Sequence, residues 1–259
     1  MKNIIFQYFI SHNGVGKDIL FKHFPKEMPE WVKRSSEYFK RYARTHKTDY
    51  LFSTSRYIKS SSNFFECLRV IKDPLFDDYD TVLYVDVDVM PKDFSKNIFE
   101  VEFGDIAGWP EWRHPDLAVP VNWSAKSTIR NRFAHFGAPI IKPKTNPLDI
   151  RVINTGVVLW SKEARFKARN KFIDHEKWFH YKNPILDKSL KNVGHSSQCL
   201  DQPYLNAMWS KFGFEVTELP IEWNRLPTKN EERPCYFAHY LQNYRFDIPK
   251  LFPKLPEDK

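Results

Sequence analysis

The sequence predicts an α/β fold in which helices flank a central, mostly parallel sheet. Short apolar segments rich in β-branched residues alternate with longer segments of helical periodicity, which is typical of this class. Polar side chains follow several apolar segments directly, as they do where ligands bind at the carboxyl ends of parallel strands. With 259 residues, 42% of them apolar, the chain is long enough for one large domain with its own core.

The first 110 residues alternate between expected strands and helices. Apolar segments predict strands at residues 3–10, 49–53, 81–85 and 105–109. Helical periodicity predicts helices over residues 31–46 and 63–72, and Asp73-Pro74 ends the second of them. The helix over 31–46 is basic and rich in aromatic residues, which we expect to face the core. A helix that faces a membrane or nucleic acid is the alternative.

Residues 110–150 interrupt this alternation and are rich in Pro, Trp and His, which predicts a long functional loop or lid. Beyond them we expect a strand at residues 152–160, a basic helix at 162–175 and a loop at 180–197. A second helix at 202–212 and a last strand at 214–219 follow. The Pro- and Lys-rich end from Pro249 is expected to fray. The prediction is therefore a single domain over residues 1–248 and a flexible tail over 249–259.

Composition limits the classes of partner and compartment. The net charge of +8 favours anionic ligands without choosing among them. Three scattered cysteines without a Cys-x-x-Cys pair predict neither a disulfide framework nor a zinc site, so a reducing compartment is expected. The chain shows no apolar stretch of membrane-spanning length and no small-residue cleavage site near its start. We therefore expect a soluble, cytoplasmic protein.

The run Thr81-Val-Leu-Tyr-Val-Asp86-Val-Asp88-Val-Met90 is the most informative segment. Side chains at i and i+2 of a strand face the same way, so Asp86 and Asp88 are expected to project together. Two such carboxylates repel unless a cation lies between them, and oxygen ligands suit Mg²⁺ or Mn²⁺, which often also hold a phosphate. The run therefore favours metal-assisted chemistry on a phosphorylated ligand. A solvated turn and the nucleophile strand of a haloacid-dehalogenase-type phosphatase are the alternatives.

Further polar clusters follow the apolar segments in a set order. They are Arg69, Tyr84–Asp88, Asn154–Gly156, Asp201–Asn206, Leu219–Asn224 and His239–Arg245. This order resembles that of the nucleotide-sugar glycosyltransferases of the GT-A fold, and most closely glycosyltransferase family 8. The resemblance covers roughly residues 60 to 245. It departs from the family at Gln242, where a Gly is usual, and at Arg245-Phe-Asp, where Lys-Pro-Trp is usual.

The resemblance implies a role for each cluster. Asp86, Asp88 and His239 would hold Mn²⁺ or Mg²⁺. Asp201 and Gln202 would be catalytic and flank the anomeric carbon of the donor sugar. The residues implied to bind the donor are Phe9, Arg69, Asp86, Asn154, Gly156 and Arg245.

Each of these residues also has a purely structural interpretation. Asp201 could cap the helix that follows it, Asn154 and Asn206 could cap a turn or a helix, Arg69 could form a surface ion pair, and His239 could be an ordinary buried histidine.

The activity implied is transfer of a sugar from a nucleotide sugar, by default a UDP-sugar, to a carbohydrate or another hydroxyl acceptor, with retention of configuration. An inverting transferase with Glu111 or Asp116 as general base is one alternative. A phosphatase, a nucleotidyltransferase that uses Gly14–Lys17, and an inactive carbohydrate-binding protein are others. Nucleic acid is not expected as a partner, because it would leave the carboxylates of Asp86 and Asp88 unexplained and carboxylates without a metal repel phosphate. A peripheral contact with a membrane through the basic helix over 31–46 remains an alternative.

Overall fold

The computed structural model describes residues 1–11, 27–60, 62–110, 153–179, 201–226, 233–240 and 242–256. Within these ranges six strands form one sheet, in the order β2-β1-β3-β6-β5-β7. Their bounds are Asn3–Tyr8 (β1), Asp49–Ser53 (β2), Thr81–Val85 (β3), Ile106–Pro110 (β5), Ile153–Ser161 (β6) and Val216–Glu218 (β7). β1 runs parallel to β2 and β3, and β5 runs parallel to β7, whereas β6 is antiparallel to β3 and β5. The predicted α/β class with a mostly parallel sheet is confirmed.

The central strands are buried on both faces. All five residues of β3 are buried, and successive residues of β3 enter different cores because side chains alternate across a strand. Val82 and Tyr84 join one cluster, which also contains Trp160 of β6. Leu83 and Val85 join the other. A sheet covered on both sides leaves its strand ends as the place where polar side chains can meet.

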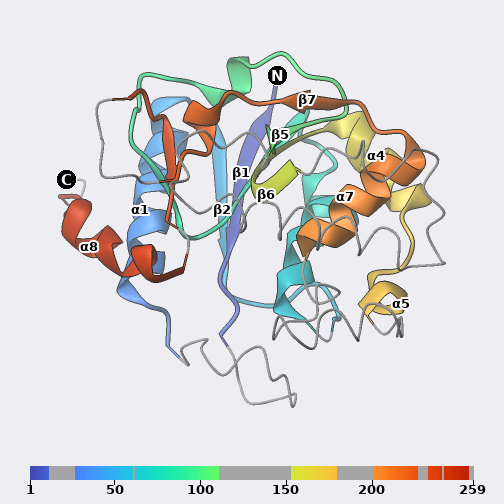
Figure 1. Cartoon of the computed structure of the whole chain (residues 1–259), viewed down its shortest axis with the longest axis horizontal. Coiled ribbons are helices and arrows are strands. Elements are labelled where there is room, and N and C mark those ends of the chain that lie inside the picture. The colour runs from blue at the N-terminus through green and yellow to red at the C-terminus, as the bar shows by residue number, and fades with distance from the viewer. Residues whose placement is uncertain are drawn as a thin grey trace, which may run out of the picture.

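Helices cover the two faces from opposite sides (Figure 1). On one side lie α1 (Glu30–Thr45) and the short α8 (Ile248–Leu251); on the other lie α4 (Lys162–Lys171) and α7 (Asp201–Phe212). Within the described ranges the other helical segments are η2 (Asn63–Leu68), α2 (Arg69–Lys72), η3 (Pro74–Phe76), η4 (Ile98–Glu100), α5 (His175–Phe179), η8 (Ile221–Trp223) and η9 (Gln242–Asp247). Trp31, Tyr38, Phe39 and Tyr42 of α1 are all buried. The aromatic residues of this helix therefore face the core, as expected.

A second, two-stranded sheet is not predicted by the sequence. β4 (Val89–Pro91) pairs antiparallel with β8 (Phe237–His239), and Val89 lies opposite His239. The backbone N–H of Tyr240 also donates to the carbonyl of Asp88 over 2.7 Å. Strands of three residues are too short to show a period in the sequence. This pairing nevertheless carries residues 237–240 to the end of β3.

Three expectations need correction. The helix predicted over 63–72 is a 3₁₀ segment, η2, followed by the single turn of α2. The strand predicted over 214–219 is limited to Val216–Glu218. The sequence predicts that the chain frays from residue 249. In the structure Pro249–Leu251 instead lie in α8, and Phe252 is buried against α1.

Two predicted segments cannot be compared with the structure. The insert predicted at 110–150 lies outside the described residues except for Pro110, and the loop predicted at 180–197 lies wholly outside them. In the part of the chain that is described, no helix combines the length and the apolar character needed to cross a membrane.

Candidate active site

Asp86 and Asp88 lie on a tight turn that links β3 to β4. The N–H of Val89 donates to the carbonyl of Asp86 over 3.1 Å, and the N–H of Asp86 donates to the carbonyl of Gly156 on β6 over 2.8 Å. The two residues therefore do not continue the strand, and the expectation that strand alternation would align them is wrong. The turn, and not the pleat of a strand, brings the two carboxylates together.

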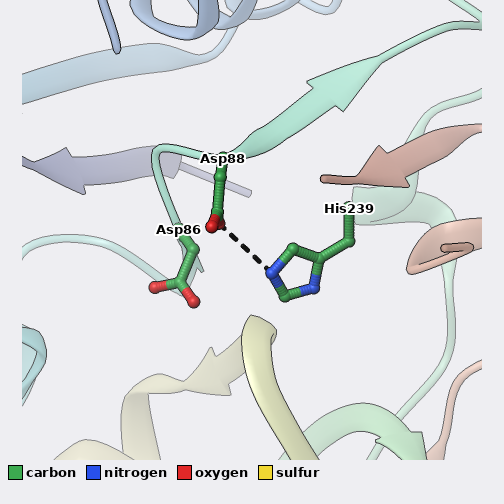
Figure 2. A group of neighbouring side chains, drawn as sticks. All are labelled: Asp86, Asp88 and His239. Carbon is green, nitrogen blue, oxygen red and sulfur yellow. Dashed lines mark ion pairs between the residues drawn. The ribbon is translucent and has the colours of Figure 1, made fainter. Parts of the chain in front are cut away.

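His239, the last residue of β8, completes a group of three candidate metal ligands. One ligand atom from each of Asp86, Asp88 and His239 lies within 4.8 Å of the other two. Figure 2 shows the imidazole of His239 and the carboxylate of Asp88 facing each other, with Asp86 beside them. His239 Nε2 lies 3.2 Å from Asp88 Oδ1. The predicted metal ligands are thus brought together from two parts of the chain.

The donor atoms of this group fit a divalent cation. His239 Nε2 is buried and has no hydrogen-bond partner among the described residues, since its contact with Asp88 lacks hydrogen-bond geometry. A buried polar atom without a partner costs free energy unless a ligand satisfies it. Two carboxylates and one imidazole suit Mn²⁺ or Mg²⁺ and leave coordination positions for phosphate oxygens.

The carboxylates at this edge of the sheet are largely shielded from water: Asp88 is buried, and Asp86 and Asp201 are half-buried. Burial, together with the charges of Asp88 and Asp201, raises the pKa of Asp86 to about 7. Burial also acts to raise the pKa of Asp88, but the neighbouring His239 and Arg245 outweigh it and hold that pKa below its ordinary value. For His239, burial acts to lower the pKa, and the charge of Asp88 outweighs it and raises the pKa. The site therefore concentrates negative charge that a cation would offset.

Asp201 and Gln202 begin α7 beside the same strand end. Burial raises the pKa of Asp201 to about 6, although its carboxylate accepts hydrogen bonds from Thr155, from Cys67 and from the first backbone N–H groups of the helix. Gln202 Oε1 accepts from the N–H of Thr155 over 3.3 Å. Asp201 is the first residue of α7 and not the residue before it, and its carboxylate accepts from the first N–H groups of the helix, which is a capping role of the kind the structural interpretation expects. It also lies near enough to Asp86 to raise that pKa, so capping and a site role are compatible.

Asn154 and Gly156 support the site from β6. Asn154 Oδ1 accepts two hydrogen bonds of 2.9 Å, one from the N–H of Gly156 and one from Nδ2 of Asn224. A Cβ on Gly156 would come within 2.3 Å of Cε1 of His239, so this position needs glycine for close approach of the ring. The oxygen of Asn154 is thus occupied by protein donors. Asn206, in contrast, binds the backbone of Ile153 and Gln202, which is a structural role.

The two predicted arginines have different surroundings. Arg245 approaches the candidate metal ligands: one of its terminal nitrogens lies 3.5 Å from Asp88 Oδ2, and its guanidinium lies 5.2 Å from the centre of the Trp31 ring. Arg69 instead pairs with Asp73 and donates to Ser53, both over 2.8 Å. The ion-pair interpretation of Arg69 therefore describes its contacts in the structure.

Phe9 lies in the core, and the candidate general bases lie outside the described residues. Phe9 is 4% exposed and packs in a core cluster with Trp31, Tyr38 and Met90. Glu111, Asp116 and the segment Gly14–Lys17 lie outside the described residues.

Several residues with no role assigned from the sequence also contact the site, among them Tyr84, Trp31 and Asn224. Tyr84 donates its hydroxyl to Asp86, Trp31 contacts Arg245, and Asn224 contacts Asn154. Tyr84 and Asn224 belong to the recognised motifs and could have been found there, whereas no signal in the sequence marks Trp31.

The structure of this chain is similar to solved structures of glycosyltransferases. One is a glycosyltransferase involved in the glycosylation of the major capsid of PBCV-1, at 14% identity and a TM-score of 0.51 over 98% of this chain and 100% of that chain. Another is the apo structure of the bifunctional WbbM, at 12% identity and a TM-score of 0.52 over 98% of this chain and 50% of that chain, so this chain spans about half of it. The galactosyltransferase LgtC with donor and acceptor sugar analogues follows at 13% identity and a TM-score of 0.48, over 98% of both chains.

The sequence itself matches none of the protein-family models and none of the curated proteins with which it was compared. At identities of 12 and 14%, the likeness to solved structures shows the fold, which is that of GT-A glycosyltransferases.

Proposed function

We propose that this protein is a metal-dependent glycosyltransferase that moves a sugar from a nucleotide sugar to a hydroxyl group of a carbohydrate or another acceptor. The observation that carries the proposal is the convergence of Asp86, Asp88 and His239 at the carboxyl end of β3, with ligand atoms within 4.8 Å of one another. Ligands in folds of this kind bind at the carboxyl ends of strands. The GT-A fold supports the same conclusion.

Asp86, Asp88 and His239 are the residues that would hold Mn²⁺ or Mg²⁺. When bound, such an ion offsets the negative charge that gathers on a departing diphosphate. Arg245 lies beside Asp88 and can place its guanidinium against the same diphosphate, because guanidinium groups suit phosphate oxygens. A uridine diphosphate is the default donor nucleotide from the family resemblance.

The proposed reaction breaks the bond between the anomeric carbon and the diphosphate oxygen, whose electron pair leaves with the nucleoside diphosphate. The acceptor oxygen bonds to the anomeric carbon, and its proton passes to an oxygen of the departing diphosphate. Positive charge that develops on the sugar ring is stabilised by Asp201, whose carboxylate is fixed by Thr155 and by the start of α7. Gln202 orients the donor. Nδ2 of Asn154, which has no hydrogen-bond partner among the described residues, is the group that would meet sugar hydroxyls.

We propose retention of configuration, with inversion by a base from residues 111–150 as the alternative. The phosphatase alternative gains no support from the two solved structures above with a TM-score over 0.5, since both are glycosyltransferases.

The proposal is tested by incubating the purified protein with Mn²⁺ and a panel of nucleotide sugars and measuring release of the nucleoside diphosphate, with and without simple sugar acceptors. We expect release from one donor, dependence on Mn²⁺, and loss of release in Asp88→Asn. The configuration of the product, read by NMR, then distinguishes retention from inversion. Release of inorganic phosphate from phosphate esters, with no turnover of any nucleotide sugar, would contradict the proposal.

A further inference from the structure

A chain of hydrogen bonds leads from the backbone of β6 to the ring of His239. Its members are Gly156, Asn154, Asn224 and His239, joined by three contacts of 2.9 Å. The resemblance assigns a metal to His239 and sugar contacts to Asn154, but it gives no role to Asn224 or to this chain. Any role of Asn224 in metal binding rests on the proposed function, because it needs the proposed metal site.

The direction of every bond in the chain follows from its first member. The N–H of Gly156 can only donate, so the atom of Asn154 that faces it must be the oxygen. That oxygen has a second lone pair, which must meet a donor, so Asn224 presents its NH₂ group to it. The oxygen of Asn224 is therefore the atom that faces Nδ1 of His239.

The tautomer of His239 is then determined. An amide oxygen can only accept, so Nδ1 of His239 carries a hydrogen. In the neutral ring, Nε2 consequently holds a lone pair. This atom is buried, has no hydrogen-bond partner among the described residues, and lies 3.2 Å from an oxygen of Asp88. Two lone pairs that face each other at this distance repel, whereas a cation between them would bind both.

Packing holds the ring in the same place. His239 is 2% exposed and Asn224 is 1% exposed, so neither side chain can turn toward water to find other partners. Gly156 leaves room for the ring because it has no Cβ. The backbone N–H of His239 donates to the carbonyl of Arg225, the residue after Asn224, over 2.8 Å. The loop that carries Asn224 is thus bonded to the strand that carries His239.

We propose that Asn224 is a positioning residue that, together with Asn154, fixes His239 as the Nδ1–H tautomer and makes Nε2 the metal-binding atom. Partners of this kind on the far nitrogen of a histidine ligand orient the ring and raise its affinity for metal. Asn224 acts through His239 and touches neither the metal nor the donor.

The first measurement is the tautomer itself. Imidazole ¹⁵N shifts are recorded on metal-free, histidine-labelled protein at alkaline pH, where the ring is neutral. The chain has nine histidines, and the signal that disappears in His239→Gln identifies the right one. We expect Nδ1–H in the wild type and in Asn224→Asp, which keeps an acceptor, but a shift toward Nε2–H in Asn224→Leu.

The second measurement is the Mn²⁺ affinity of the same proteins by calorimetry. Removal of such a partner typically weakens metal binding about 10- to 100-fold, and this is the loss expected for Asn224→Leu. Asn224→Asp should bind more tightly than Asn224→Leu. Asn206→Leu is the matched control, because Asn206 is also buried and bonded to backbone but does not contact His239. It should lower the melting temperature and leave both the tautomer and the Mn²⁺ affinity unchanged.

The outcomes separate this inference from the proposed function. If the wild type binds Mn²⁺ and Asn224→Leu has the same tautomer and affinity, the inference is wrong and the proposed metal site stands. Weaker binding without a change of tautomer would assign Asn224 a merely structural role and also overturn the inference. If the wild type does not bind Mn²⁺, the metal part of the proposed function fails, and this inference fails with it. Should Asn224→Leu not fold, an Nε2–H tautomer in Asn224→Asp would be enough to overturn it.

Discussion

Among single residues, the aspartates at the end of β3 dominate the behaviour of this site. Asp86 has Asp88 and Asp201 as neighbours in a buried environment, and its pKa is raised to about 7 as a result. Asp88 differs because His239 and Arg245 lie within 3.2 and 3.5 Å of its two oxygens. The pKa values of Asp86 and Asp88 thus shift in opposite directions, because negative charges face the first carboxylate and positive charges face the second.

This electrostatic arrangement predicts how the metal-free protein responds to pH. The folded pKa of Asp86, about 7, lies above its ordinary value of 3.8, so the folded state holds this proton more tightly than the unfolded state does. The stabilisation is present below about pH 4 and is lost as the pH rises toward 7. In the presence of EDTA, the melting temperature should therefore fall between pH 5 and pH 8.

Asp86→Asn tests this response. This variant should reduce the pH-dependent loss of unfolding free energy by roughly 1 to 3 kcal/mol, which corresponds to a few degrees in melting temperature for a chain of this length. Some dependence of the melting temperature on pH should remain in this variant, because the pKa of Asp201 is also raised. Thermal unfolding at several pH values measures the effect, and equal slopes in both proteins would show that Asp86 does not hold the extra proton.

Asp201 gives a second prediction at single-residue level. Asp201→Asn keeps the size of the side chain and removes the charge that the proposed mechanism places beside the sugar, so nucleoside diphosphate binding with Mn²⁺ should persist. The rate of transfer should fall by about 100-fold or more. A steady-state assay of diphosphate release measures kcat and KM separately, and the loss should be in kcat. Asp77→Asn, at a residue paired with Arg169 away from the site, is the control and should keep its activity.

Among the structural elements, the pairing of β4 with β8 does most to build the site. It joins residues 89–91 to residues 237–239 and places His239 beside the turn that carries the two aspartates. α8 supports this arrangement from outside, because Phe252 packs edge-on against Tyr38 of α1 and against Tyr240, which follows β8. Tyr38 also donates its hydroxyl to the carbonyl of Pro253.

The role of α8 can be tested at its last residue, Leu251, and at Phe252, which follows it. Phe252 is 7% exposed and Leu251 is 53% exposed. Phe252→Ala should lower the free energy of unfolding by about 3 kcal/mol, as for other buried phenylalanines, and Leu251→Ala should change it by less than about 0.5 kcal/mol. Urea unfolding of both variants measures the difference. Similar small losses would mean that α8 does not pack on α1 in solution.

The sequence can predict those elements that repeat a pattern over five or more residues. The runs that form β1, β2, β3, β5 and β6 are apolar enough to be recognised. β4 and β8 have three residues each, and their pairing depends on a contact between segments about 150 positions apart. The order at Phe252 is not predictable because one aromatic residue among Pro and Lys shows no periodicity, although its burial orders the segment.

The candidate site is predictable in part for a similar reason. Asp86, Asp88 and His239 stand in motifs, and the structure brings them together. Their alignment comes from a turn. Aspartate suits a turn, which is the alternative that the sequence leaves open, but Val85, Val87 and Val89 around the two aspartates favour a strand. The contacts of Asn224 depend on the close approach of β6, the residues after η8, and β8, and no single segment contains that information. Arg69 stands in a donor-binding motif, but its acidic partner, Asp73, is only four residues away.

For the molecule as a whole, the fold separates stability from chemistry. Both faces of the sheet are covered by core clusters and helices, so the apolar side chains are used in packing. Asp86, Asp88, Asn154, Asp201 and His239 instead meet at one edge of the sheet, where strand ends and a helix N-terminus converge. A ligand bound there contacts several elements at once and should stabilise the whole fold against unfolding.

The most direct test uses that stabilisation. Melting temperatures are measured with UDP, GDP, ADP and CMP, each with and without Mn²⁺, for the wild type and for Asp88→Asn. A ligand at 100 times its dissociation constant adds about 2.7 kcal/mol, roughly 5 to 10 °C for a chain of this length. We predict that one nucleotide raises the melting temperature only when Mn²⁺ is present, and that Asp88→Asn abolishes the rise. No shift with any nucleotide, or a shift that needs neither Mn²⁺ nor Asp88, would contradict a metal–diphosphate site at the end of β3.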